Sequence, residues 1–416
     1  MKRIFAATVL ASCSLAGVAA AQTVPSEPVS FGNGRVVIGG DAAVSISPED
    51  DAYFNYSNYD HNTLREFRLG MTAQVRATER ISVLGELRTE NIDHISPYAL
   101  YARIRPFPTR RLDVQIGRIP PTFGRFPRQA YSRDNPLIGY PLAYQYLTSL
   151  RADALPATAD ELLRMRGRGW RSSFTVGNTT PDHGVPLVNS LSWDTGVQGT
   201  MSWDRVTVTG AVTNGTESNP RVSDDNGGKQ IATRVSVQPL PGLSIGSSFA
   251  KGEFVSRHAA TAAQLGDTSF SQRADGLDIE YSRSHWVARA DAVLSRWRLP
   301  MIGALRGGTP TLDPPSTVTP ESYVARLRAL ALSIEGRYTF LPGAYVAARA
   351  EHLGFNRITG SNGPQTWDAN VRRFEIGGGY YLQRNVIARV SWQYNERDTA
   401  RFNRGRFAAA QLLFWF

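Results

Sequence analysis

The chain has 416 residues and a formal net charge of +10, from 46 Lys and Arg against 36 Asp and Glu. Its one cysteine, Cys13, lies in an N-terminal segment that we expect to be removed, which excludes disulfide scaffolds, thiolate metal sites and cysteine nucleophiles in the mature protein. The arginines are spread through almost every segment and mixed with acids, whereas a nucleic-acid site gathers its basic residues on one face.

The first 21 residues are typical of a secretory signal peptide. Lys2 and Arg3 provide the positive start, a short apolar stretch follows, and Ala19-Ala20-Ala21 provides an A-x-A cleavage site. We therefore predict a signal peptide over residues 1–21 and a single exported domain over residues 22–416.

An alternative interpretation of the same segment remains open. Leu10-Ala11-Ser12-Cys13 is similar to the lipobox of bacterial lipoproteins, which would place a lipid on Cys13. After this segment no run of 18 apolar residues occurs, so the sequence predicts no transmembrane helix.

The main signal in the rest of the chain is an alternation of apolar and polar residues. From Phe67 to Ala77, every odd-numbered residue is apolar and the residues between are polar or glycine. Successive side chains of a strand point to opposite faces, so this pattern predicts a ribbon with one apolar and one hydrated face. We predict sixteen such strands: Arg35–Ile46, Phe67–Ala77, Ile81–Glu90, Tyr98–Arg105, Leu112–Gly117, Leu191–Ser202, Val206–Asn214, Gln230–Gln238, Leu243–Lys251, Leu277–Arg283, Trp286–Leu294, Leu330–Thr339, Ala344–Leu353, Phe374–Leu382, Val386–Asn395 and Phe407–Phe416.

The connections between these segments fall into two classes. Seven are short, and eight are longer and rich in Gly, Pro, Asn and Asp, with short and long alternating from end to end. This alternation is typical of an antiparallel up-and-down barrel with short periplasmic turns and long extracellular loops. We therefore predict an all-β fold, a transmembrane barrel of about 16 strands. The short connections are Thr78–Arg80, Pro106–Arg111, Trp203–Arg205, Pro239–Gly242, Ser284–His285, Leu341–Gly343 and Gln383–Asn385.

The energetic cost of placing polar groups in hydrocarbon decides which face of the barrel points toward lipid. Hydrocarbon cannot satisfy unpaired backbone groups, so a spanning sheet must close, with its apolar side toward lipid. Leu330, Leu332 and Ile334 therefore point outward, whereas a charge facing lipid at mid-depth would cost ~2–4 kcal/mol and belongs in a hydrated lumen. The charged residues expected on the lumen wall are Arg68, Arg76, Glu86, Arg88, Arg103, Asp113, Asp291, Glu335, Arg337, Arg349, Glu375 and Arg389.

Some residues depart from this pattern. Leu84 and Val293 fall on the hydrated side, and Arg326 and Arg328 share the outward side with Leu330. We expect the two arginines to lie above the membrane, at the outer rim. Aromatic residues suit the membrane interface, where an amphipathic ring sits between lipid and water. The candidates for such girdles are Tyr338, Phe340, Tyr380, Trp392, Tyr394 and Phe414.

The C-terminus and one internal segment carry a family resemblance. The last six residues, Gln411-Leu412-Leu413-Phe414-Trp415-Phe416, resemble the terminal signature that the barrel assembly machinery reads in bacterial outer-membrane proteins. Gln115–Arg125 resembles the strand-end Gly followed by Phe-Gly in general and phosphate-selective porins. With the sixteen strands, these motifs indicate the outer-membrane porin superfamily. The resemblance implies a homotrimer in outer-membrane lipids, with Phe416 as its assembly signal.

The same resemblance gives a role to the long connection over residues 118–189. In trimeric porins the loop after the fifth strand folds into the barrel and narrows it. Here Thr158 is expected to cap a short helix that ends at Met165. Residues of this connection expected to pack on the inner wall are Tyr131, Tyr140, Tyr144, Tyr146, Leu147, Leu150 and Trp170.

Arginines dominate the charge of this connection. Rings of arginine favour anions in pores, so we predict a constriction with a mild anion preference. The alternative is that these arginines are paired with acids of the loop or with wall carboxylates such as Glu86, Asp113 and Glu335. The candidates are Arg118, Arg125, Arg128, Arg133, Arg164, Arg166 and Arg168.

The resemblance implies a water-filled channel for passive diffusion of small hydrophilic solutes. Two other functions remain open. One is a substrate-specific channel, in which aromatic residues of the long connection form a track for a sugar or an organic acid. The other is a structural or secretion barrel that does not conduct.

Catalytic and metal motifs are weak in this sequence. Gly242–Gly246 matches G-x-S-x-G, but it opens a strand after a tight turn and no helix follows, as a nucleophile elbow would need. The six histidines do not have zinc-ligand spacing. Asp224–Gly227 offers oxygen ligands of the kind that calcium prefers, although a plain polar loop explains it better. We predict no enzymatic activity, no cofactor and no metal.

Overall fold

The computed structural model describes residues 27–57, 62–108, 111–129, 133–263, 270–300 and 324–416. The predicted signal peptide, with its cleavage site and the alternative lipid site at Cys13, lies outside the described residues, as does Tyr131. Among the described residues, no helix is both long and apolar enough to cross a membrane.

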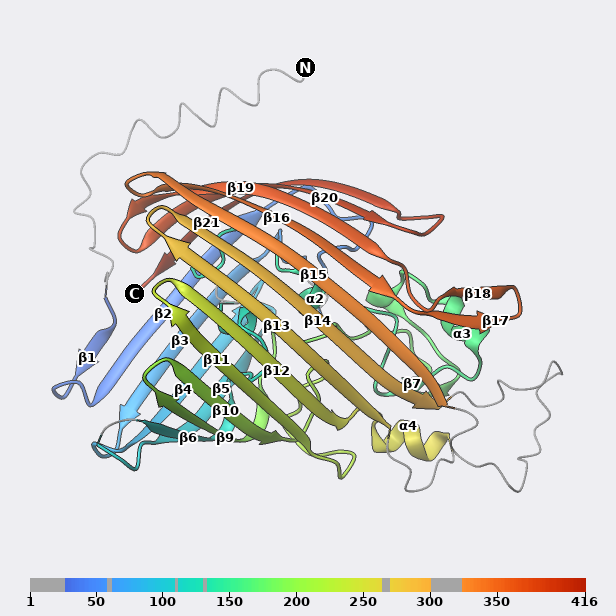
Figure 1. Cartoon of the computed structure of the whole chain (residues 1–416), viewed down its shortest axis with the longest axis horizontal. Coiled ribbons are helices and arrows are strands. Elements are labelled where there is room, and N and C mark those ends of the chain that lie inside the picture. The colour runs from blue at the N-terminus through green and yellow to red at the C-terminus, as the bar shows by residue number, and fades with distance from the viewer. Residues whose placement is uncertain (1–26, 58–61, 109–110, 130–132, 264–269, 301–323) are drawn as a thin grey trace, which may run out of the picture.

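Sixteen long antiparallel strands form one closed sheet (Figure 1). Strand β2 pairs with β3 on one side and with β21 on the other, so the barrel has no open edge. The predicted sixteen-stranded all-β barrel is confirmed. In chain order its strands are β2 (Val36–Ile46), β3 (Phe67–Arg76), β4 (Ile81–Glu90), β5 (His94–Ile104), β6 (Leu112–Ile119), β9 (Asp194–Trp203), β10 (Val206–Thr213), β11 (Gln230–Leu240), β12 (Leu243–Glu253), β13 (Ser271–Arg283), β14 (Trp286–Pro300), β15 (Val324–Leu341), β16 (Ala344–Phe355), β19 (Val371–Gln383), β20 (Val386–Arg397) and β21 (Arg404–Trp415).

The C-terminal residue completes the seam of the barrel. The Phe416 N–H donates to the Gly40 carbonyl at 3.0 Å, and the Gly40 N–H donates back to the Phe416 carbonyl at 3.1 Å. A short extra strand, β1 (Val29–Phe31), pairs with β2 near the same seam. The last residue of the chain therefore joins the first barrel strand to the last.

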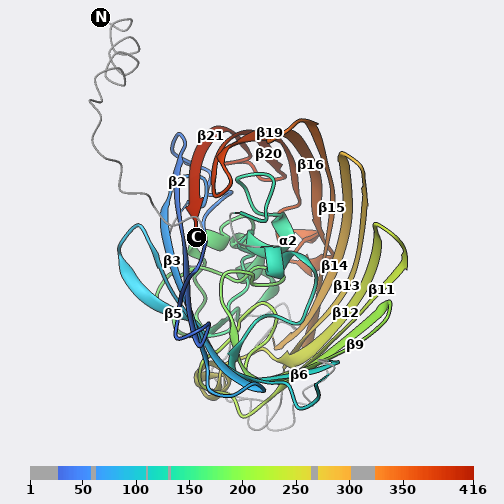
Figure 2. The same ribbon diagram turned by 90° about the vertical axis from the view of Figure 1, so that its left-hand side faces the viewer.

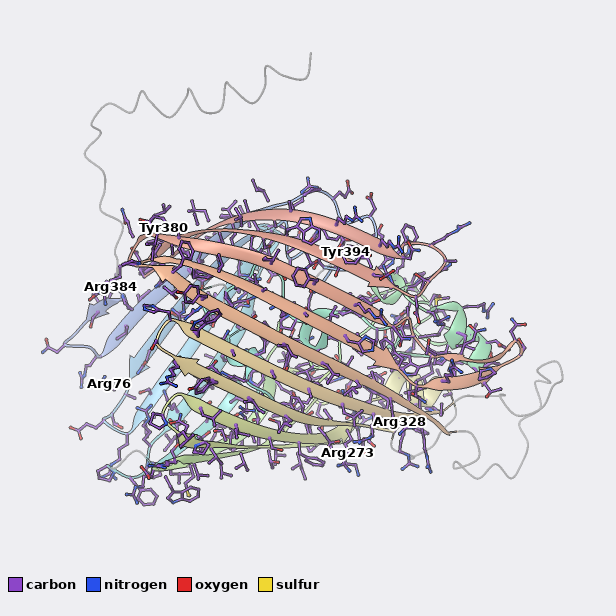
Figure 3. The ribbon with its side chains drawn as sticks, turned by 45° about the horizontal axis from the view of Figure 1, so that its top comes forward. Arg76, Arg273, Arg328, Tyr380, Arg384 and Tyr394 are labelled. Carbon is purple, nitrogen blue, oxygen red and sulfur yellow. The ribbon has the colours of Figure 1, made fainter. Side chains whose placement is uncertain are left out.

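The two faces of the wall differ as the alternation requires. Along β20, Val390 and Trp392 are 63% and 42% exposed on the outside, whereas Gln393 and Asn395 are fully buried on the inside. Figure 3 shows Tyr380 on the outer surface near the short turns, an end that we call the turn end. The other end carries the long connections and is called the loop end. An apolar outside and a polar inside are what a water-lined barrel in lipid needs.

Three strands extend six residues further toward the loop end than the alternation predicted. They are β13, β14 and β15. In the extensions the outward side carries Arg273, Arg298 and Arg326 in place of apolar residues. The alternation therefore stops marking these strands near the place where they leave the hydrocarbon, although their backbone pairing continues.

The strict alternation of short and long connections is wrong at one point. Strands β4 and β5 are joined at the loop end by only three residues, Asn91–Asp93. Asn91 and Ile92 have positive φ angles of 53° and 61°, as the two central residues of a type I′ hairpin turn do. A bulge in the β4–β5 register accommodates Pro97, which has no N–H to donate to the ladder.

Most of the long connection between β6 and β9 lies inside the ring of strands (Figure 2), and we call its described residues, 120–129 and 133–193, the inner loop. It has little regular structure. The Thr158 side chain accepts a hydrogen bond from the Glu161 N–H and caps a short helix, as predicted. The elements of the inner loop are η2 (Phe126–Gln129), α2 (Leu142–Gln145), β7 (Ala154–Leu155), α3 (Ala159–Arg164), η3 (Gly169–Arg171) and β8 (Val176–Gly177). Elsewhere, α4 (Arg257–Ala262), β17 (Arg357–Gly360) and β18 (Gly363–Thr366) lie in other connections.

Apolar residues of the inner loop form the main hydrophobic core, together with the inner wall. Tyr144 and Leu187 of the loop belong to the same buried cluster as Val293 and Trp297 of β14. Val293, which departed from the alternation, is therefore an apolar wall residue covered by the loop. Burial of such large side chains contributes ~1.5–3 kcal/mol each, which keeps the loop seated in the lumen.

Candidate functional site

The inner wall carries a cluster of buried charges on neighbouring strands. Arg349 of β16 is 1% exposed, and its guanidinium lies 3.2 Å from Glu335, 3.2 Å from Glu351 and 2.8 Å from Glu375. One arginine shared by three carboxylates leaves acceptor oxygens available for other donors. The inner loop supplies those donors.

Backbone groups of the inner loop bind directly to this cluster. The Gly139 N–H donates to Glu375 at 2.9 Å, and the Leu142 N–H donates to Glu351 at 2.7 Å. In return, Arg349 donates to the Gly139 carbonyl at 2.6 Å. Polar groups that burial would leave unsatisfied are therefore paired across the interface of loop and wall.

Further along, the loop contacts strands β12 to β14. The Gly124 N–H donates to Ser248 at 3.0 Å, Arg125 donates to Glu280 at 2.6 Å, and the Tyr144 hydroxyl donates to Asp291 at 2.7 Å. Burial, assisted by the nearby Asp291 carboxylate, raises the pKa of Tyr144 well above its usual range, so the hydroxyl stays protonated as a donor. The loop is thus held against the wall from several strands.

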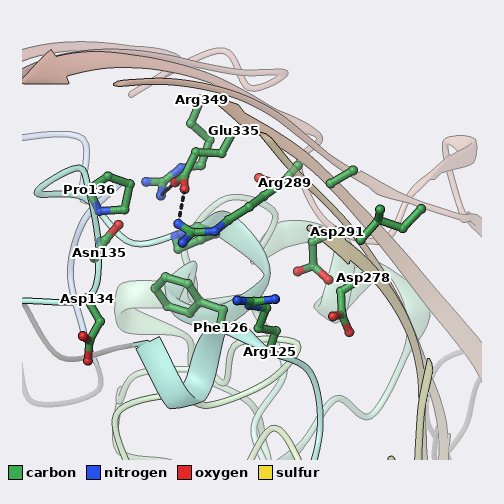
Figure 4. Close-up of a pocket in the computed structure, with 14 residues that line it drawn as sticks. Arg125, Phe126, Asp134, Asn135, Pro136, Asp278, Arg289, Asp291, Glu335 and Arg349 are labelled. Atoms are coloured by element: carbon green, nitrogen blue, oxygen red, sulfur yellow. Dashed lines mark hydrogen bonds and ion pairs between the residues drawn. The ribbon is translucent and has the colours of Figure 1, made fainter. Parts of the chain in front are cut away.

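A small cavity of about 50 Å³ lies where the inner loop meets β13–β16 (Figure 4). It has room for only a few water molecules. Arg289 points across it and lies 2.7 Å from Glu280 and 2.7 Å from Glu335. The charges almost balance, so this region has little net field of one sign. The charged residues that line it are Arg125, Arg289, Arg349, Asp134, Asp278, Asp291 and Glu335.

Two larger cavities, of about 430 and 340 Å³, lie near the turn end of β3–β6 and share Arg103 and Arg105. We call them the turn-end cavities. Arg105 lies 3.1 Å from Asp113, and Arg103 contacts the same carboxylate. Five arginines face two carboxylates here, an excess of three positive charges. The charged lining consists of Arg76, Arg80, Arg103, Arg105, Arg111, Glu79 and Asp113.

Solved structures match this barrel, whereas no protein-family model and no curated protein sequence does. OmpF of Salmonella typhi, in complex with daunomycin, is 10% identical with a TM-score of 0.52, over 92% of this chain and 97% of that chain. The trimer form of OmpT of Vibrio cholerae is 9% identical, with a TM-score of 0.51 over 92% and 99%. An anion-selective porin from Comamonas acidovorans is 8% identical, with a TM-score of 0.50 over 92% and 99%.

The chain has the fold of the outer-membrane porins. A closed barrel of sixteen strands with an apolar outer side is an outer-membrane structure, and the fold places the chain in that membrane. The predicted resemblance to the porin superfamily is confirmed at the level of fold.

In this porin fold, the twelve charged residues predicted for the lumen wall lie on the inner side of their strands. Most are buried against one another or against the inner loop. Arg76 and Arg103 line the turn-end cavities, Asp291 lines the small cavity, and Arg337 lies over the Tyr345 ring at 5.7 Å from its centroid. The buried ones are Arg68, Glu86, Arg88, Asp113, Glu335, Arg349, Glu375 and Arg389.

The seven arginines predicted for the constriction do not gather at one place. Arg125 lies at the small cavity and pairs with Glu280, and Arg133 lies 3.6 Å from Asp134. The side chain of Arg128 lies outside the described residues. The alternative that loop arginines are paired with acids therefore describes Arg125 and Arg133.

The prediction for Arg118 is wrong. It lies in β6 opposite Leu100, which is 58% exposed, so both residues are on the outward side of the wall. Its guanidinium donates to the carbonyls of Trp193, at 3.1 Å, and of Pro97. The residue satisfies backbone acceptors at strand ends and does not face the lumen.

The prediction for the arginines near α3 is also wrong. Arg166 donates to Thr366 of β18 at 2.9 Å and lies 3.4 Å from Asp398, both beyond the ends of the barrel strands. Arg164 and Arg168 are exposed. Helix α3 packs against the β17–β18 hairpin at the loop end, so these three arginines lie at the mouth of the barrel (Figure 1).

Sequence reasoning missed several inner-wall residues. Arg234 and Asp278 form a bidentate pair with distances of 2.5 and 2.8 Å, and Arg373 donates to the carbonyls of Tyr140 at 2.8 Å and Phe54 at 2.9 Å. Their place in the alternation marked them as inward-facing. The alternation did not predict that Arg373 contacts two separate loops, through Tyr140 and Phe54.

Catalytic and metal-binding arrangements were tested at the motifs named above. Gly242–Gly246 opens strand β12, so the strand–turn–helix context of a nucleophile elbow is missing there. Asp224 pairs with Lys229, and Asp225 pairs with Arg221. Within the described parts of the chain, no group of three or more His, Cys, Asp or Glu side chains is arranged to hold a metal ion.

Proposed function

We propose that this chain forms a water-filled channel in the outer membrane for passive diffusion of small hydrophilic solutes, with a mild preference for anions. The observation that carries the preference is the excess of three positive charges around the turn-end cavities. Rings of arginine and lysine favour anions in pores. The charges near the inner loop almost balance, so they contribute little to selectivity.

Three arginines of the turn-end cavities are the strongest candidates. Arg76, Arg80 and Arg111 are exposed, and among the described residues they have no carboxylate within 4.0 Å. An exposed and unpaired guanidinium attracts mobile anions, whereas a paired one has its charge largely compensated. These residues, rather than the arginines of the inner loop, are therefore proposed to set the anion preference.

The test is the reversal potential of a single channel in a planar bilayer under a potassium chloride gradient. The intact protein should show a ratio of chloride to potassium permeability above one. Combined Arg76→Gln, Arg80→Gln and Arg111→Gln should bring this ratio to about one or below. The matched control is Arg164→Gln with Arg168→Gln and Arg171→Gln, which removes three exposed arginines of the α3 and η3 region and should change the ratio less.

Cation preference in the intact protein would contradict the anion proposal but leave the channel proposal standing. Folded, pure protein that carries no current would contradict both and would favour a structural or secretion barrel. The specific-channel alternative gains no support from Tyr140, Tyr144 and Tyr146, because these side chains are 3%, 1% and 2% exposed and offer no stacking surface. We propose no enzymatic activity and no cofactor.

We also propose that the channel is a homotrimer assembled by the barrel assembly machinery, with Phe416 as the recognised residue. The pairing of Phe416 with Gly40 supports a role in closing the seam. Deletion of Phe416 should lower the yield of assembled barrel in cells by more than it lowers refolding of pure protein in detergent. Chemical cross-linking in native membranes should give trimers, and a monomer as the sole product would contradict the trimer.

A further inference from the structure

Four asparagines of this chain are followed directly by glycine: Asn33, Asn214, Asn226 and Asn362. The side-chain amide of an asparagine reacts with the backbone nitrogen of the next residue when that nitrogen reaches its Cγ atom. Glycine has no side chain to obstruct this approach, and its backbone adopts more conformations than that of other residues. The four pairs are therefore equivalent in sequence, and the folded structure decides which of them react.

The pair Asn226-Gly227 is held at both reacting groups. The Gly227 N–H donates to the Asp224 carboxylate at 2.9 Å, so the nitrogen that would attack is occupied. The Asn226 side-chain nitrogen donates to the Glu253 carbonyl at 3.0 Å, and its side-chain oxygen accepts from the Gly228 N–H at 3.0 Å. The reaction at Asn226 would have to break these hydrogen bonds first.

Two further pairs are restrained at their glycine. Gly215, which follows Asn214, is buried, and its N–H lies 2.9 Å and 3.2 Å from the two carboxylate oxygens of Asp194. Asn362 is exposed in the turn of the β17–β18 hairpin, but Gly363 belongs to β18 and is paired with β17. Hydrogen bonds therefore protect Asn214, and strand pairing limits the movement of the chain after Asn362.

The pair Asn33-Gly34 lacks such restraints. Asn33 is exposed in the turn that joins β1 to β2 at the turn end (Figure 1). Among the described residues, no hydrogen bond engages its side chain or the Gly34 N–H. The φ angles of Asn33 and Gly34 are 55° and 80°, in the left-handed region that asparagine and glycine adopt more readily than other residues. Both reacting groups of this pair are therefore free.

We propose that Asn33 is a site of spontaneous deamidation. Hydroxide removes the proton of the Gly34 N–H, and the nitrogen forms a bond to Cγ of Asn33. The side-chain nitrogen takes up a proton from water and leaves as ammonia, so that a succinimide ring remains. Water that cleaves the new bond gives aspartate. Water that cleaves the original peptide bond gives isoaspartate, whose main chain runs through Cβ and Cγ.

The modification changes the turn but not the barrel. Each event adds one negative charge at the turn end, next to Arg35 in the sequence. Isoaspartate also adds one carbon to the main chain of the turn, which disturbs the three residue pairs that hold β1 on β2. Strand β2 keeps its pairing with β3 and β21, so the barrel stays closed. The inference does not depend on conduction through the channel.

The experiment keeps the folded protein in detergent at mildly alkaline pH and follows the four asparagines by peptide mass spectrometry. The peptide with Asn33 should lose its amide first, followed by the peptide with Asn362. Loss at Asn214 and Asn226 should be on the order of tenfold slower than at Asn33, because their hydrogen bonds must open before the reaction. An isoaspartate-specific methyltransferase should label the Asn33 peptide, because it does not accept ordinary aspartate.

Three controls test whether the fold decides the order. In denaturant all four asparagines should react at similar rates. Asn33→Gly keeps the left-handed turn and removes the amide, so the methyl label at this position should disappear. Asp224→Ala frees the Gly227 N–H and should raise the rate at Asn226 toward that at Asn33.

Two results would overturn the proposal. One is equal rates at all four asparagines in the folded protein, because the hydrogen bonds would then protect nothing. The other is an Asn33 amide that persists while Asn226 reacts.

Discussion

The two halves of the lumen use arginine in different ways. The inner loop fills one part of the lumen, which we call the loop half. There Arg349 is buried, contacts three carboxylates and donates to the carbonyl of Gly139. The turn-end cavities occupy another part of the lumen, which we call the turn half. There Arg76 and Arg80 line a cavity and are exposed. The residue type is the same, but the solvent around it is not. A buried arginine must be paired because its desolvation is costly, whereas a hydrated arginine can stay unpaired and act on ions.

This difference separates the charges that hold the inner loop in place from the charges that are proposed to act on ions. The paired charges of the loop half hold the inner loop in place and cancel much of each other's field. The unpaired charges of the turn half hold nothing in place and keep their field. Charge composition alone is therefore a poor guide to selectivity, since most inner-wall charges are used for docking.

The largest effect is expected from removing Arg349. Substitution by Met leaves three buried carboxylates without their shared cation and should destabilise the folded barrel by about 3–5 kcal/mol. The measurement is the temperature at which the folded form is lost on electrophoresis without prior boiling. Arg103→Met in the turn half is the control, and it should cost less than about 1 kcal/mol because its side chain is 31% exposed. Equal losses of stability in both variants would contradict the proposed difference between the two halves.

A smaller effect is expected from Glu217, which lies in the β10–β11 connection. Its carbonyl accepts a hydrogen bond from Asn189 of the inner loop at 2.6 Å. Burial, with a contribution from the Asp194 charge, raises the pKa of the Glu217 carboxyl from 4.5 to about 8. Stability from the neutral carboxyl is therefore fully present below pH 4.5 and is lost as the pH rises through about 8.

Melting of the intact protein between pH 5 and pH 9 should show this loss, of roughly 2 kcal/mol after the loop relaxes around the charge. Glu217→Gln keeps the shape of the side chain without its charge and should remove the part of the pH dependence that is centred near pH 8. Identical pH profiles for the two proteins would rule out Glu217 as the source.

A smaller loss still is expected at Gly139. A β-carbon there would lie 2.6 Å from Glu375 and 2.6 Å from Gln393, closer than such atoms approach. Gly139→Ala should therefore push the loop away from the wall, cost about 1–2 kcal/mol and increase the noise of the open-channel current. Gly336→Ala is the control, since a β-carbon at Gly336 meets nothing within 4 Å. A Gly139→Ala variant with unchanged stability and unchanged current noise would mean that the loop is not held at this point.

The smallest effect is expected from a change in salt concentration on the proposed anion preference. The Debye length falls from about 10 Å at 0.1 M to about 3 Å at 1 M, so mobile ions screen exposed arginines more than buried pairs. The proposed anion preference should therefore weaken by roughly twofold in permeability ratio between these concentrations. Reversal potentials measured at a constant gradient ratio test this. A preference that does not change with salt would point to the buried loop half as its source.

The sequence predicted the strands of the barrel wall better than the path of the inner loop. Alternation marked Arg349 and Glu375 as inward-facing because a strand has only two sides. It did not predict where the arginines of the long connection would go. Arg118 lies on the outward side of a strand and Arg166 lies at the mouth, because the path of the connection depends on contacts with wall residues far away in the chain.

The amino-acid sequence by itself determined the strand count, the closure of the sheet and the face of the twelve predicted wall charges, because side chains of a strand alternate between two faces and hydrocarbon offers no hydrogen-bond partners. Only the tertiary structure decided which charges are paired and which remain open to water. Pairing depends on distances between residues such as Leu142 and Glu351, which are remote in the chain and meet only when the loop folds into the closed barrel.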